Sequence, residues 1–156
     1  MGVDFKRSVW YNVVVIISLE INMDSTKTAK ALPSVMALSF LGDSRHSLYV
    51  RKKLVEQGIS KSKELNEESL KYVTCEKQAL MYEKISTVLT EEEASVFKRA
   101  FNSGHLNKPK RASGKEYRTA TGFEAVIGLL EWQGNGERLE YLLDLAHEEI
   151  KNDTQG

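Results

Sequence analysis

The chain contains 156 residues, of which 41% are hydrophobic, and its 22 basic residues balance 22 acidic ones. This length and apolar content suit one folded domain and exclude a disordered or fibrous chain. Because the charges balance, any sign of a nucleic-acid partner must come from local clusters of charge. The single cysteine, Cys75, allows no internal disulfide bond, and we therefore expect a reducing compartment, the cytoplasm.

Residues 1–22 contain a β-branched run over residues 13–17, for which three interpretations are open. A membrane span needs about 20 apolar residues, and polar residues such as Glu20 make this stretch too short. A secretory signal would have a small-residue cleavage site where Glu20 stands. In the third interpretation Met23 is the biological start and residues 1–22 are an upstream extension. We favour the third, with a soluble appended strand as second choice, and expect a folded domain over residues 23–156 and no membrane segment.

A helical pattern begins after residue 24, and Pro33 fits the first turn of a long helix that ends at Gly58. This helix carries an acid, Asp43, directly after Gly42, a residue that would let another backbone approach closely. Because residues three and four apart lie side by side on a helix, one face collects small polar groups around the carboxylate. The face consists of Ser39, Asp43, His46 and Ser47. Such a face is unusual in a core helix and marks a candidate site.

Two short helices are predicted next, over residues 65–73 and 79–88, with Cys75 between them as a small buried hydrophobic residue. Thr90 and Glu93 have the spacing of a capping box, in which each side chain bonds the backbone amide of the other residue. A further helix is therefore expected to start there. Near the end of the chain, residues 133–136 predict a turn and residues 137–150 a final amphipathic helix.

Positive charge is concentrated between residues 98 and 118, where seven basic residues accompany one acidic residue. Glycine, asparagine, serine and proline are interspersed, so we expect a long flexible loop of the kind that often carries function. Its cations suit a phosphodiester backbone, which offers dense negative charge, while a merely soluble loop is an equally weighted alternative. The candidate nucleic-acid-binding residues are Lys108, Lys110, Arg111, Lys115 and Arg118.

A second acid, Glu124, lies in a helix that is apolar on nearly every side and has small residues at Gly122, Ala125 and Gly128. A buried carboxylate without a partner is costly, so it should become protonated, pair with a base or bind a metal ion. Two acids on two core helices, Asp43 and Glu124, therefore suggest a shared metal ion.

The two acid-bearing stretches, Phe40–Asp43 and Phe123–Gly128, resemble the paired signature of ribonuclease III domains. Further residues resemble Mini-ribonuclease III, the short bacterial form without a separate double-stranded-RNA-binding domain. These are Tyr49-Val50-Arg51, Arg99, Asn102, Tyr117-Arg118 and Thr121–Ala125. The resemblance covers roughly residues 32–150. It implies an all-α fold, the ribonuclease III catalytic domain, in a homodimer whose signature helices pack together.

The resemblance also implies that Asp43 and Glu124 hold a catalytic Mg²⁺, for which Mn²⁺ is a substitute. The reaction would be hydrolysis of double-stranded RNA that leaves 5′-phosphates. Full-length ribonuclease III has two further acids at the positions of Ser39 and Thr121, and hydroxyl residues there fit the Mini form, so both are candidate accessory residues. His46 is a third candidate, to orient a water or contact phosphate. The simpler alternative is that His46 packs in the core and makes one hydrogen bond.

Two departures from the family pattern leave two functions open. Residues 44–47 replace small apolar residues, an aromatic and an acid, and Phe101 replaces a basic residue. The first function is a cytoplasmic, Mg²⁺-dependent endoribonuclease that acts on precursor ribosomal RNA, with a ribosomal protein as a helper that presents the substrate. The alternative is a catalytically weak or silent ribonuclease III-like module that binds RNA or ribosomes.

Overall fold

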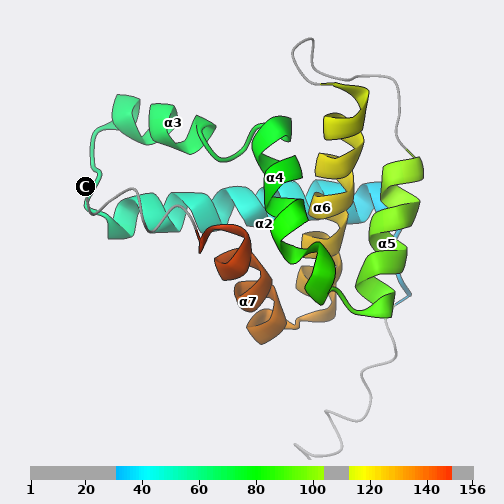
Figure 1. Cartoon of the computed structure of the whole chain (residues 1–156). Helices are drawn as coiled ribbons and strands as arrows, with labels where there is room; N and C mark the ends of the chain where they lie inside the picture. The colour runs from blue at the N-terminus through cyan, green and yellow to red at the C-terminus, as the bar shows by residue number, and fades with distance from the viewer. Residues whose placement is uncertain (1–30, 104–112, 149–156) are drawn as a thin grey trace, which may run out of the picture. The chain divides into compact units, whose positions relative to one another are not determined.

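The computed structural model describes residues 31–103 and 113–148, and Figure 1 shows their arrangement. All described elements belong to the compact unit that begins at Pro33. Every regular element in these two ranges is helical, which confirms the predicted all-α fold. The elements are α2 (Val35–Glu56), α3 (Ser62–Leu70), α4 (Cys75–Ile85), the short 3₁₀ helix η1 (Ser86–Val88), α5 (Glu91–Asn102), α6 (Gly114–Gln133) and α7 (Gly136–Ala146). The predicted extension over residues 1–22 lies outside the described residues.

Helix α6 is the centre of this unit, and α2, α4, α5 and α7 pack around it (Figure 1). Between residues 119 and 130 every residue is buried except Glu124, which is half-buried. A helix surrounded by other helices has no solvent-facing polar side, which explains why its sequence is apolar nearly all round. Its larger side chains, such as Phe123 and Ile127, fill a core that residues of α2, α4 and α7 complete. Glu124 therefore interrupts an otherwise apolar stretch.

Helices α2 and α6 touch through their backbones at two glycines. A Cβ atom added to Gly42 of α2 would overlap the carbonyl group of Glu124, and one added to Gly128 of α6 would overlap the carbonyl group of Leu38. Each glycine thus removes the side chain that would otherwise separate the two helices. The prediction that Gly42 lets another backbone approach closely is confirmed.

Several predicted helix ends are also confirmed. The capping box is present, with Thr90 Oγ1 accepting from the Glu93 amide at 3.3 Å and Glu93 Oε2 accepting from the Thr90 amide at 2.8 Å. Helix α2 is followed by Gly58 at φ 84°, and α6 by Gly134 at φ 70°. These left-handed conformations favour glycine and stop each helix.

The prediction of a long loop over residues 98–118 is wrong at both ends. Residues 98–102 belong to α5, and residues 114–118 belong to α6. A second capping box starts α6, because Ser113 Oγ accepts from the Glu116 amide at 3.1 Å and Glu116 Oε2 accepts from the Ser113 amide at 2.7 Å. Such a cap contributes about 1 kcal/mol, enough to begin a helix among residues with loop-like composition.

Two smaller predictions need correction. Cys75 does not stand between two helices as a buried residue; it is the half-buried first residue of α4, which Thr74 caps. The final helix ends at Ala146, before the predicted end at residue 150. None of the helices in residues 31–103 and 113–148 has the length and apolar content that a membrane span requires.

Candidate functional site

Asp43 and Glu124 lie where α2 crosses α6. Gly42, the residue before Asp43, contacts the backbone carbonyl of Glu124, so the crossing brings the two acids into one region. Asp43 is exposed, and Glu124 is half-buried. Ser39, one turn before Asp43 on α2, donates a hydrogen bond from Oγ to Glu124 Oε2 at 2.8 Å. The structure thus brings together three residues that the sequence singled out.

The electrostatic surroundings of Glu124 oppose its ionisation. Its pKa is raised to about 7, chiefly because burial removes water from the carboxylate. The hydrogen bond from Ser39 lowers the pKa, the charge of Asp43 raises it, and a hydrogen bond from Gln78 lowers it. All of the hydrogen-bond donors in this set are neutral. A bound cation would favour the ionised carboxylate, because an opposite charge nearby stabilises it.

The donor atoms at the crossing fit a cation that prefers oxygen ligands. Asp43 and Glu124 supply carboxylate oxygens, whereas a structural zinc site would need four protein ligands rich in nitrogen or sulfur. Within residues 31–103 and 113–148, no group of three or more histidine, cysteine or acidic side chains is placed to enclose a metal ion. Mg²⁺ suits such a partial set, because it keeps several waters and binds through one or two carboxylates plus substrate oxygens. The residues present can therefore hold Mg²⁺.

Two of the candidate accessory residues use their polar atoms elsewhere. Thr121 Oγ1 donates to the carbonyl of Tyr117 in its own helix at 3.0 Å. His46 is fully buried, with its Nε2 3.0 Å from Nε2 of His147. Burial lowers the pKa of His46 to about 4, so its ring is neutral at physiological pH. The structure places His46 in the core, where its ring also meets Phe123 edge-on.

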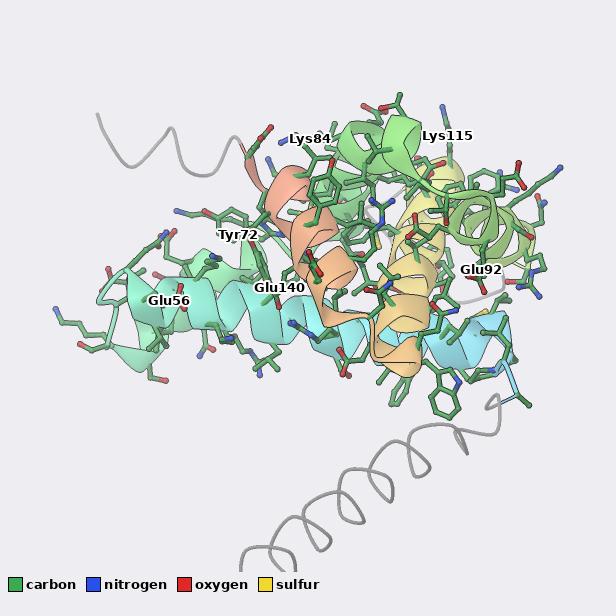
Figure 2. All side chains as sticks on the ribbon, turned by 90° about the horizontal axis from the view of Figure 1, so that it is seen from below. Glu56, Tyr72, Lys84, Glu92, Lys115 and Glu140 are labelled. Carbon is green, nitrogen blue, oxygen red and sulfur yellow. The ribbon has the colours of Figure 1, made fainter. Side chains whose placement is uncertain are left out.

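Two residues of the divergent stretch over residues 44–47, Arg45 and His46, have partners outside α2. Arg45 forms ion pairs with Glu131 of α6, at 3.0 Å, and with Glu140 of α7. Figure 2 labels Glu140 on α7, near α2. His46 is matched in the same way by His147, which follows α7. These departures from the family pattern therefore support packing between α2, α6 and α7.

Sequence reasoning missed Gln78 and His147. Gln78 lies on α4 with 1% of its surface exposed, where its side chain contacts His46 and lowers the pKa of Glu124. Its neighbours Glu76 and Lys77 are charged, so the local pattern suggests a surface residue. Only the helical spacing to the buried Met81 and Ile85 marks the inward side of α4. His147 follows Leu139 and Leu143 at helical spacing, and this continuation of the inward face of α7 is the signal that could have identified it as buried.

The predicted cations are only partly within the described residues. Lys115 and Arg118 are exposed near the start of α6, and Figure 2 labels Lys115. The Arg118 guanidinium lies 4.9 Å from the centre of the Phe101 ring. Phe101, which replaces a basic residue of the family pattern, thus supports a cation on the neighbouring helix. Lys108, Lys110 and Arg111 lie outside the described residues.

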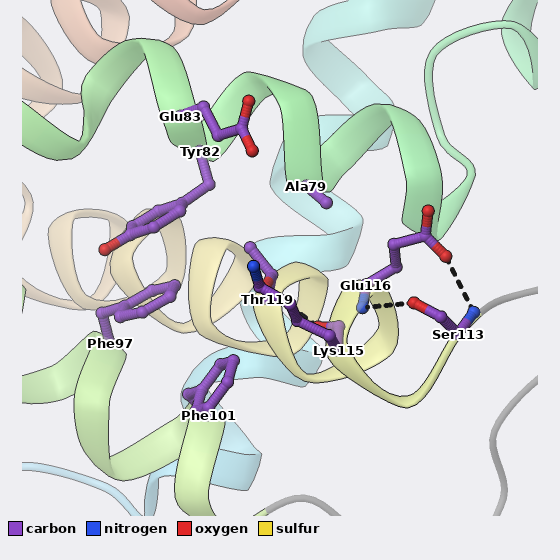
Figure 3. A pocket seen from close by; sticks show the side chains of 9 residues that line it. All are labelled: Ala79, Tyr82, Glu83, Phe97, Phe101, Ser113, Lys115, Glu116 and Thr119. Atoms are coloured by element: carbon purple, nitrogen blue, oxygen red, sulfur yellow. Dashed lines mark hydrogen bonds between the residues drawn. The ribbon is translucent and has the colours of Figure 1, made fainter.

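A hollow of about 450 Å³ lies between α4, α5 and the start of α6 (Figure 3). Figure 3 shows the rings of Tyr82, Phe97 and Phe101 along it, and the first two stack with 3.7 Å between their centres. Neither Asp43 nor Glu124 lines this hollow. The aromatic rings fix α4 against α5, and we assign the hollow no part in the chemistry at the helix crossing.

Two carboxylates at the crossing of two core helices, in an all-helical domain, define a candidate metal-dependent hydrolase. The sequence pattern described as the Ribonuclease III domain matches residues 36–135. A crystal structure of a Fusobacterium nucleatum protein is similar to this fold, with a TM-score of 0.69 and 30% sequence identity. The similarity covers 75% of this chain and 93% of that one.

Similar named proteins are Mini-ribonuclease 3 from several bacteria. The Streptococcus pneumoniae protein is 40% identical over 120 residues, which is 74% of this chain and 92% of the relative. The Thermoanaerobacter sp. protein is 37% identical over 126 residues, which is 81% of this chain and 89% of the relative. The chain therefore belongs to the ribonuclease III family of endoribonucleases, in its Mini-ribonuclease 3 branch. The resemblance and the fold predicted from the signature stretches are confirmed.

Proposed function

We propose that the protein is a homodimeric endoribonuclease that cleaves double-stranded RNA with Mg²⁺, and that Asp43 and Glu124 hold the ion. One observation carries this proposal. Asp43 and Glu124 lie at the glycine-mediated crossing, where burial and the charge of Asp43 oppose ionisation of Glu124. A cation would relieve that opposition, as Mg²⁺ does in sites built from one or two carboxylates. The ion would lower the pKa of a bound water and offset charge on the phosphate.

The protein's own residues would orient the carboxylates and hold the RNA backbone. Ser39 fixes one oxygen of Glu124 through its hydrogen bond of 2.8 Å. Lys115 and Arg118 are exposed at the start of the helix that carries Glu124, and they would contact phosphates together with Lys108, Lys110 and Arg111. Duplex RNA is read largely through its shape and 2′-hydroxyls, so a small domain of this kind needs no base-reading motif.

An exposed apolar side of α2 supports the homodimer. Phe40 is 79% exposed, and Met36, Leu48 and Val55 on the same helix are 44%, 52% and 62% exposed. Large apolar side chains grouped along one helix mark an interaction surface, and a second copy of the chain would cover them. Light scattering should give the mass of a dimer for the wild type and of a monomer for Phe40→Glu. A monomeric wild type at micromolar concentration would contradict the homodimer.

The activity is tested by cleavage of a synthetic RNA duplex with Mg²⁺. The wild type should produce fragments with 5′-phosphates, and Asp43→Asn and Glu124→Gln should each slow cleavage on the order of 1,000-fold. Circular dichroism checks that both variants remain helical. A wild type no faster than the two variants would leave the alternative of a silent RNA-binding or ribosome-binding module.

Precursor ribosomal RNA is the substrate we propose, with a ribosomal protein that presents it. Duplex precursor ends should be cut faster after that protein is added than in its absence. Cells without this gene should accumulate unprocessed ribosomal RNA ends, which primer extension would detect. Normal ends in such cells would exclude this substrate while leaving the general activity intact. The cytoplasmic location stays a prediction from the single cysteine.

A further inference from the structure

A chain of buried polar side chains joins the candidate site to the far end of α7. The side-chain amide of Gln78 on α4 lies close enough to the Glu124 carboxylate to lower the pKa of that carboxyl as a donor, and Gln78 Nε2 lies 3.4 Å from His46 Nδ1 on α2. His46 Nε2 in turn lies 3.0 Å from Nε2 of His147. Gln78 is 1% exposed, His46 0% and His147 5%, so solvent does not supply their hydrogen bonds. Three helices and the residue that follows α7 therefore contribute to one network.

The chemistry of each group fixes the direction of this network. A carboxylate accepts hydrogen bonds, so Gln78 must present its NH₂ group to Glu124. That nitrogen has a second hydrogen and no free lone pair, so His46 Nδ1 must be the acceptor. The proton of the neutral His46 ring is then on Nε2, which donates to Nε2 of His147. Each hydrogen bond thus fixes the donor and acceptor roles of the next group in the network. Both N–H groups of the Gln78 amide act as donors, one toward Glu124 and the other toward His46 Nδ1.

The packing around this network restricts movement of its members. The His46 ring meets Phe123 edge-on, with 5.3 Å between ring centres, and Phe123 directly precedes Glu124 on α6. His147 also lies against Tyr49, with 5.0 Å between ring centres. A side chain held by buried hydrogen bonds and ring contacts keeps one rotamer, and so directs its donor at a fixed point.

The neutral character of Gln78 matters as much as its place. An arginine or lysine here would match the charge of Glu124 and compete with a metal ion for it. An amide orients the carboxylate and leaves its charge available. Groups that hydrogen-bond a metal-binding carboxylate in this way tune the affinity of the site, typically by 10- to 100-fold.

We propose that Gln78 is a positioning residue for the metal site, which holds the Glu124 carboxylate in the orientation that binds the ion. His46 holds the Gln78 amide in place on the side away from Glu124, and His147 holds His46. This inference rests on the proposed function, because it takes Asp43 and Glu124 as the metal-binding carboxylates.

The experiment compares Gln78→Met with a matched control, Gln133→Met. Gln133 also donates from Nε2 to a carboxylate, that of Glu92 at 3.0 Å, but on an exposed surface away from the crossing. The probe is Mn²⁺, whose free concentration is followed by electron paramagnetic resonance in the full chain. Gln78→Met should weaken Mn²⁺ binding about tenfold and raise the half-saturating Mg²⁺ for cleavage by a similar factor. Cleavage at saturating Mg²⁺ should recover most of the wild-type rate, and Gln133→Met should change neither quantity.

A second variant, Gln78→Asn, keeps an amide but withdraws it by one methylene group. It should weaken Mn²⁺ binding as Gln78→Met does, and it keeps the inference testable if the methionine variant does not fold. Wild-type Mn²⁺ affinity in the folded variants would overturn the positioning role of Gln78. Glu124→Gln separates this failure from a failure of the proposed function. If Glu124→Gln also binds Mn²⁺ like the wild type, the proposed metal site is contradicted. If Glu124→Gln loses binding while the Gln78 variants keep it, only the positioning role of Gln78 is contradicted.

Discussion

Glu93 and Glu124 are two acids in the interior with opposite surroundings. Glu93 is 3% exposed, and its Oε1 and Oε2 accept hydrogen bonds from Nε and Nη2 of Arg138 at 2.9 and 2.8 Å. Glu124 accepts a hydrogen bond from Ser39, and the other polar group that lowers its pKa is the neutral amide of Gln78. Burial would raise the pKa of Glu93, but the bonds from Arg138 and the Thr90 amide outweigh it and hold that pKa below its usual value. The pKa of Glu124 is raised instead.

This difference separates an acid that supports the fold from the acid that we propose as a metal ligand. The charge of Glu93 is matched inside the protein, where it joins α5 to α7. The charge of Glu124 has no such match among its neutral hydrogen-bond partners, so it is stabilised when a cation arrives. Removing one partner of a buried ion pair leaves the other charge uncompensated, whereas neutralising an unmatched carboxylate removes a destabilising charge.

The largest expected effect comes from forcing apart the two helices whose crossing forms the Glu124 site. Gly42→Ala should lower the free energy of unfolding by about 3 kcal/mol or more, because the new Cβ overlaps the backbone of α6. Cleavage should fall with it, since Asp43 and Glu124 are pushed apart. Gly136→Ala is the matched control, with open space around its Cβ, and should change stability by less than about 1 kcal/mol. Urea unfolding measures both, and equal effects would contradict the close backbone contact.

Breaking the matched acid should have the next largest effect. Glu93→Gln should lower the free energy of unfolding by about 3 kcal/mol at pH 7, because it leaves Arg138 without its anionic partner. Since the folded-state pKa of Glu93 is lowered, its stabilisation is present above its usual pKa and is lost as the pH falls through the lowered value. The difference from wild type should therefore shrink as the pH falls below the usual pKa of a glutamate. Glu92→Gln, on the exposed side of α5, should stay within about 0.5 kcal/mol of wild type.

Neutralising the unmatched acid should have the opposite sign. Without divalent ions, Glu124→Gln should be more stable than wild type at pH 8, by on the order of 2 kcal/mol. The pKa of Glu124 is raised from 4.5 to about 7, so the folded wild type binds the extra proton and loses stability as the pH rises between these values. The difference should disappear near pH 4, where both states are protonated. A constant difference from pH 4 to pH 8 in thermal unfolding would contradict the raised pKa.

The smallest effect is expected at Thr121. Thr121→Val should leave the cleavage rate within about twofold of wild type, because the Thr121 hydroxyl donates to the Tyr117 carbonyl of its own helix. Loss of that hydrogen bond should lower the free energy of unfolding by about 1 kcal/mol. Ser39→Ala removes a bond to Glu124 itself and should slow cleavage more than Thr121→Val does. Initial rates on the same RNA duplex compare the two variants. A tenfold loss in Thr121→Val would show that Thr121 acts at the site.

The sequence alone predicted most of the helices, the cap formed by Thr90 and Glu93, and the two acids, because these features depend on residues close together in the chain. Apolar periodicity located the long helix that carries Asp43, and a three-residue spacing located the cap formed by Thr90 and Glu93. Two glycines and two acids in signature stretches were enough to identify the family. The loop over residues 98–118 was predicted too long, because its composition outweighed the second capping box at Ser113 and Glu116.

Tertiary structure decided which polar groups meet. His46 and His147 are 101 residues apart in the chain, and Arg45 and Glu140 are 95 apart, so no local pattern could pair them. The neighbours of Glu124 depend on how closely α2 approaches α6, which the missing side chains of Gly42 and Gly128 allow. Only that packing placed Gln78 beside Glu124, and it decided that this acid has neutral partners while Glu93 has a charged one. The sequence determined which acids are candidates for the chemistry, and the packing determined the charge environment of Glu124.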